Sequence, residues 1–181
     1  MTPAASDEGM PRPDATRAER GELLETLGKH RQFLRHTVRG LTDEEAAQRT
    51  TVSELCLGGL IKHVTQVEAG WAQFIRTGPA AVAGADEAAM AAHAAGFRMS
   101  AGETLTQLLD QYDQVATGTD ELVRTLASLD RSHPLPEAPW FEPGARWSAR
   151  RVVLHIIAET AQHAGHADII RESLDGAKTM G

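Results

Sequence analysis

The chain has 181 residues and a mass of 19.5 kDa, a size that fits one domain. It carries 18 Lys and Arg against 25 Asp and Glu, a net charge of −7. This argues against nucleic-acid or anionic-membrane partners, because phosphate contacts need clustered cations. The single cysteine, Cys56, excludes an intramolecular disulfide and a four-cysteine zinc site. The chain has no long apolar run and no signal-like start, so we expect a soluble cytoplasmic protein.

The hydrophobic pattern predicts one helical domain with a tail at each end. Residues 1–15 hold three prolines and no hydrophobic period, so we expect a flexible tail there. The folded domain is expected over 16–176, and residues 177–181 form a short C-terminal tail. Apolar residues at helical spacing predict four long helices, which run over about 16 to 38 or 39, 53 to 76, 100 to 130 and 148 to 174.

Local signals mark the ends of these helices. Gly40 ends the first helix, and Thr42 is a candidate N-cap of a short acidic helix that follows it. The S-x-x-E pattern at Ser100 has the form of a capping box, and Ser148 caps the last helix, which ends at Asp175-Gly176.

Two connections in this pattern are long. Residues 77–99 are rich in Ala and Gly and form a connection with a little helix of its own. Residues 131–147 hold four prolines beside Trp140, Phe141 and Trp147, which indicates a structured loop. With no convincing strand and no internal repeat, the fold class is all-α, a four-helix bundle with long crossover connections.

The last helix carries an unusual polar stripe. At ~100° per residue, His155, Glu159, His163 and His166 fall on one line between the apolar Val152 and Ile170, which we interpret as core-facing. Burying a carboxylate beside imidazoles is costly unless each finds a partner. The stripe is therefore a buried polar network, a solvent-facing row or a metal site.

The metal site is favoured because a third ligand is at hand. Glu159 and His163 lie one turn apart, and His63 lies on the apolar face of the second long helix. Two histidines and one glutamate with an open fourth position are a common catalytic zinc arrangement, although nickel, iron or manganese also suits these ligands. Cys56 is interpreted as a core residue. Four other histidines are interpreted as structural or surface residues, namely His30, His36, His93 and His133.

Two motifs resemble the DinB-like family, in its actinobacterial branch of mycothiol S-transferases and mycothiol-dependent maleylpyruvate isomerases. They are Leu60-Ile-Lys-His63 with Val67-Glu68-x-x-Trp71, and Glu159-x-x-x-His163-Ala-Gly-His166-Ala-Asp168-Ile-Ile-Arg171-Glu172 with Asp175-Gly176. The resemblance covers about 17–176 and implies a DinB-like four-helix bundle, a divalent metal and, in many members, a homodimer. His63, Glu159 and His163 match the family's metal ligands. Many DinB-like proteins have His at the position of Glu159, and the isomerase branch shares this chain's departure from that pattern.

The resemblance also implies the function. A metal held by two His and one Glu would activate a low-molecular-weight thiol such as mycothiol for attack on a small electrophile, in S-transfer or isomerisation. His166 is expected to contact the substrate or support a ligand, and the resemblance leaves it open as a fourth ligand, with His155 as an outside candidate. His166 or Glu68 could move a proton. The alternatives are a hydrolase that uses metal-bound water and a non-enzymatic, metal-binding stress or interaction bundle.

Overall fold

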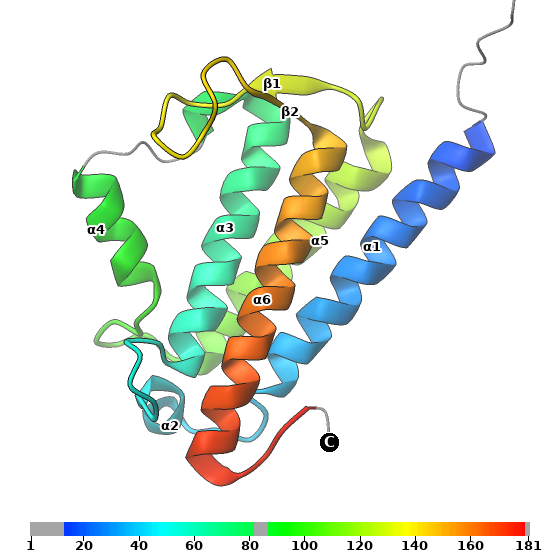
Figure 1. The fold of residues 1–181 in the computed structure, drawn as a ribbon. Coiled ribbons are helices and arrows are strands. Elements are labelled where there is room, and N and C mark those ends of the chain that lie inside the picture. Colours follow the sequence, from blue (N-terminus) through cyan, green and yellow to red (C-terminus); the bar gives the residue numbers. More distant parts are fainter. Residues whose placement is uncertain (1–12, 82–86, 180–181) are drawn as a thin grey trace, which may run out of the picture.

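Four long helices dominate the part of the chain that the computed structural model describes, residues 13–81 and 87–179 (Figure 1). They are α1 (Pro13–His36), α3 (Leu57–Thr77), α5 (Leu105–Thr125) and α6 (Ala149–Asp175). The short elements are α2 (Asp43–Ala47), the 3₁₀ turn η1 (Pro79–Ala81), α4 (Glu87–Gly96) and the strands β1 (Ser132–Pro134) and β2 (Arg146–Ser148). The predicted all-α bundle with long connections is confirmed.

The connection through α4 sets the direction of the helices. It carries the chain back along the outside of the bundle, so α5 starts at the same end as α3 and runs in the same direction (Figure 1). Helix α3 packs against both α5 and α6, and α1 packs against α6 and α5. Helices α3 and α6 are therefore antiparallel neighbours, which brings residues far apart in the sequence side by side.

Helix α1 begins at Pro13, three residues before the predicted start. A proline suits the first turn of a helix, where its missing N–H has no partner to lose. The rest of the expected tail over 1–15 lies outside the described residues, as do residues 180 and 181 of the expected C-terminal tail. Among the described residues, the helices are all too short or too polar to cross a membrane.

Several predicted caps are confirmed. Thr42 and Glu45 form a capping box at α2, and the hydroxyl of Ser148 accepts a hydrogen bond from the backbone N–H of Arg151 at 3.2 Å. Gly176 ends α6 in the left-handed region at φ 79°, a conformation that favours glycine.

The predicted capping box at Ser100 is wrong. Glu103 does accept a hydrogen bond from the backbone N–H of Ser100, but Gly102 takes a φ of +86° and closes a turn there. The N-cap lies four residues later, at Thr104, which forms a capping box with Gln107, and the helix begins at Leu105. The helix also ends earlier than predicted, at Thr125 rather than 130. At this end the Arg20 guanidinium donates hydrogen bonds to three carbonyl groups of the last turn and the C-cap.

The connection between α4 and α5 crosses α3 at close range. A Cβ atom on Gly59 would lie 1.9 Å from the Phe97 carbonyl oxygen, and one on Gly58 would lie 2.2 Å from the sulfur of Met99. At Gly59 the contact is with backbone and only glycine fits, whereas at Gly58 the flexible Met99 side chain could move. Gly59 therefore lets this connection pass over α3 and places Phe97 above the next turn of that helix.

The Pro-rich connection forms a small antiparallel hairpin, which the sequence did not predict as strands. Ser132 pairs with Ser148 and His133 with Trp147. Each strand has only three residues, too few to show a period of two. The hairpin holds Trp147 against Trp71 of α3, with ring centroids 4.8 Å apart and nearly parallel planes.

Candidate metal centre

The structure brings together the three ligands predicted from the sequence. His63 projects from α3, and Glu159 and His163 project from α6, one turn apart. One ligand atom from each residue can be chosen so that all three lie within 4.8 Å of one another. Glu159 Oε2 is 3.6 Å from His163 Nε2, and the rings of His63 and His163 meet at a T-shaped contact, with centroids 4.7 Å apart.

The electrical state of the site suits cation binding. Burial, with smaller contributions from nearby His163 and His93, lowers the pKa of His63 to about 4 against the opposing effect of Glu159, so the imidazole is neutral at neutral pH. The hydrogen bond from His163 and the neighbouring imidazoles lower the pKa of Glu159, which is therefore ionised. Neutral imidazole and ionised carboxylate are the forms that bind metals.

These residues fit a divalent cation with nitrogen and oxygen ligands. Two ligand atoms bound to one tetrahedral zinc at about 2.0–2.1 Å are separated by ~3.4 Å. The 3.6 Å between Glu159 and His163 is close to that value, and small side-chain movements would bring His63 into the same range. A structural zinc site has four protein ligands, whereas a group of three leaves one position for another molecule.

The polar stripe of α6 lies at the edge of the buried face rather than in its centre. The most deeply buried side chains of α6 follow a neighbouring line through Val153, Ile156 and Thr160, because α6 must pack against α1 as well as α3. Glu159 keeps 27% of its side-chain surface exposed and His163 11%. The site is therefore open on one side, which the prediction of a core-facing stripe did not anticipate.

Two further histidines flank Glu159 and His163 on α6. Nδ1 of His166 lies 3.4 Å from Nδ1 of His163, on the side of that ring away from Glu159. His155 lies one turn before Glu159, with its Nε2 3.8 Å from Glu159 Oε1. Burial lowers the pKa of His155, which outweighs the opposing effect of Glu159.

Sequence reasoning missed the cover that the connection around α4 supplies. Phe97 stacks on His63 with ring centroids 3.9 Å apart, and His93 of α4 makes a T-shaped contact with His63 at 5.1 Å. His93 is exposed, as expected, but it faces the site. The Ala-rich segment has no amphipathic period that could have signalled this contact.

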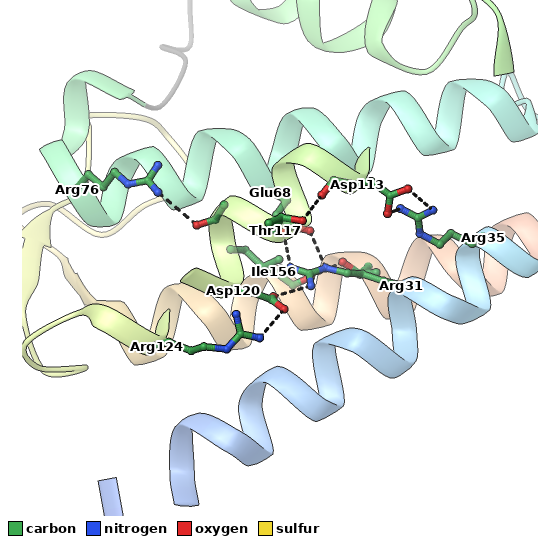
Figure 2. Close-up of polar contacts among 11 residues, drawn as sticks. Arg31, Arg35, Glu68, Arg76, Asp113, Thr117, Asp120, Arg124 and Ile156 are labelled. Atoms are coloured by element: carbon green, nitrogen blue, oxygen red, sulfur yellow. Dashed lines mark hydrogen bonds and ion pairs between the residues drawn. The ribbon is translucent and has the colours of Figure 1, made fainter. Parts of the chain in front are cut away.

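Glu68 lies outside the site. It follows His63 by five residues, which turns its side chain about 140° around α3. Glu68 is fully buried between helices, where the Arg31 guanidinium of α1 donates hydrogen bonds to both of its oxygens, at 2.5 and 3.2 Å. The same guanidinium also donates a hydrogen bond to Asp120 of α5 (Figure 2). The Glu68 carboxylate is thus part of an ion-pair network between α1, α3 and α5, and the idea that it moves a proton at the site is wrong.

The remaining candidates also lie apart from the three ligands. Cys56 is buried at the N-cap of α3, where its sulfur accepts a hydrogen bond from the backbone N–H of Gly59. His133 Nε2 is 3.3 Å from the carbonyl oxygen of Ile75, near the hairpin. His30 and His36 lie on α1, as surface or structural residues.

Comparison with protein families adds an independent finding. The family model of the mycothiol S-transferases matches residues 22–176, which is most of the chain and includes all four long helices in whole or in large part. A search of curated protein sequences finds no match. The matched region contains His63, Glu159 and His163. Because the match covers most of the chain, the chain belongs to the mycothiol S-transferase family.

Proposed function

We propose that the protein is a metal-dependent thiol S-transferase in which His63, Glu159 and His163 hold one divalent cation. Zinc is the first choice for two imidazoles and a carboxylate, and nickel, iron and manganese suit the same donors. The observation that carries the proposal is the convergence of these three side chains from α3 and α6 in a member of a thiol-transferase family. Mycothiol is the proposed co-substrate, and a small electrophile receives its sulfur.

A divalent cation at this site would supply Lewis acidity, which lowers the pKa of a coordinated thiol from its ordinary ~8.5. The overall reaction is a substitution or an addition. Sulfur loses its proton and forms a bond to an electrophilic carbon, and either a leaving group departs with its bonding pair or the attacked double bond takes up a proton. The half-exposed edge of α6 gives both reactants access to the ligands.

The residues around the proposed ligands would orient the His163 ring, bind the electrophile and exclude water from His63. When Nε2 of His163, which faces Glu159, binds the cation, the proton of that ring lies on Nδ1 and can be donated to Nδ1 of His166, 3.4 Å away, which would fix the orientation of the His163 ring. The Nε2–H of His166 is then a donor that can bind an oxygen or halide of the electrophile. Phe97 covers one face of His63 and keeps water from that side.

Metal content and thiol dependence test the proposal. Purified protein should contain about one equivalent of metal, and both His63→Ala and His163→Ala should lose it, whereas the exposed His36→Ala on α1 should retain it. Full metal retention in both ligand variants would remove the site.

The zinc-loaded protein is then mixed with an aryl halide or an activated alkene, with and without mycothiol. We expect turnover only with the thiol, and a lower rate for His166→Ala. Turnover that ignores the thiol would contradict transfer and favour a hydrolase.

A further inference from the structure

The two oxygens of Glu159 face different partners. Oε2 lies 3.6 Å from Nε2 of His163, on the side where the three proposed ligands converge, and Oε1 lies 3.8 Å from Nε2 of His155. The three residues follow one another at intervals of four, so they line one edge of α6. A ligand that uses Oε2 leaves Oε1 to be held by another group, and His155 is in place for it.

His155 is itself held by two indole rings from outside α6. The ring of Trp71, on α3, and the ring of Trp147, at the end of the hairpin, each make a T-shaped contact with it at 5.0 Å. The two indoles stack on each other at 4.8 Å, and the Arg151 guanidinium lies 4.4 Å from the Trp147 ring. Contacts with two elements outside α6, namely α3 and β2, therefore restrict the histidine ring far more than a lone i,i+4 pair on a helix surface would.

We propose that His155 is a positioning residue for Glu159, held in place by the stacked Trp71 and Trp147. The proposal rests on the metal site of the proposed function. The 3.8 Å between His155 Nε2 and Glu159 Oε1 is an ion-pair contact, and a small movement of either side chain would bring it to hydrogen-bond distance. A carboxylate whose second oxygen is held in this way loses little rotational freedom when its first oxygen binds a cation, so affinity rises. The proposal also assigns a role to the Pro-rich hairpin. Trp147 of β2 lies one residue before the N-cap of α6, and through His155 it connects the hairpin to Glu159, one turn further along the helix.

Zinc affinity, measured by competition with a chromophoric chelator, tests the proposal. The His155→Phe variant keeps an aromatic ring against the two indoles and removes the ring nitrogens. We expect its zinc affinity to fall by about 10- to 100-fold, the usual effect of losing a residue that supports a metal ligand. The His155→Gln variant returns an N–H donor and should recover part of the loss. The neighbouring exposed Leu154→Ala is the matched control and should bind zinc like the unmodified protein.

A second measurement separates positioning from simple damage to the fold. Cobalt absorption spectra report the geometry at the metal, and we expect them to change in His155→Phe while the melting temperature of the metal-free protein stays within a few degrees. If His155→Phe fails to fold, Trp147→Phe and His155→Gln carry the test through the same affinity measurement. Unchanged zinc affinity in the folded variants would overturn the proposal. Unchanged affinity in His163→Ala would instead overturn the site itself, so the two failures are distinguishable.

Discussion

The buried ion pair between Arg31 and Glu68 offers a sharp test of how the bundle is held together. We consider the Glu68→Gln variant, which keeps the shape of the side chain and removes its charge. Glu68 has no exposed surface, and the Arg31 side chain is 7% exposed. Burial alone would lower the pKa of Arg31, but Glu68 and Asp120 outweigh it and the pKa is raised, so the guanidinium stays charged in the interior.

The size of the effect follows from the partners that remain. Removing one half of a buried pair costs about 3–5 kcal/mol, because the other charge is left without compensation. Arg31 keeps its contact with Asp120 at 2.8 Å in the variant, so we expect a loss at the lower end, about 3 kcal/mol. This is a large part of the ~5–15 kcal/mol that stabilises an ordinary domain.

Urea denaturation of the metal-free protein measures the change. The control is Asp113→Asn, which breaks the more exposed pair with Arg35 on the neighbouring turn and should cost under about 1 kcal/mol (Figure 2). The double variant Arg31→Met/Glu68→Leu should lose less than Glu68→Gln, since it leaves no buried charge unpaired. Equal, small losses for Glu68→Gln and Asp113→Asn would refute the reasoning. Zinc affinity should be unchanged in Glu68→Gln.

Three further predictions concern other parts of the fold. The pKa of His63 falls from 6.5 to about 4 on folding, so the unfolded chain takes up a proton first as the pH drops. The metal-free protein should therefore be about 2 kcal/mol less stable at about pH 5 than at pH 7, and His63→Leu should flatten this dependence in urea titrations. Gly59→Ala should cost about 3 kcal/mol or more by the same assay because its Cβ meets the Phe97 carbonyl, whereas Gly165→Ala, with nothing within 4 Å, should be neutral or stabilising. Ser148→Ala should lower stability by about 1 kcal/mol in thermal melts, through the lost N-cap of α6.

The sequence predicted best those features that depend on neighbours within a few residues. The last helix, with its cap at Ser148 and its stop at Gly176, needs only local periodicity and end signals. The pairing of His63 with Glu159 and His163 needed more, namely that two helices face each other. The position of His63 on an apolar face suggested this, and a family resemblance then supported it.

The features that escaped prediction depend on contacts across the fold. Arg31 and Glu68 are ordinary charged residues in the sequence, and only the packing of α1 on α3 shows that they meet in the interior. A short helix was expected within residues 77–99, but α4 buries little beyond Gly96, so no apolar face indicated its contact with His63. Ser100 had the right residue three positions later for a cap, but Gly102 bends the chain before a helix can start.

The position of Cys56 matters for a protein of this family. Its side chain is 3% exposed and lies beneath the carbonyl group of Phe97, toward which its S–H points at 3.7 Å. Reagents that alkylate sulfur reach exposed thiols far more readily than a buried one. The chain has no other cysteine. Its one thiol is therefore shielded from electrophiles, in part by the segment that carries Phe97.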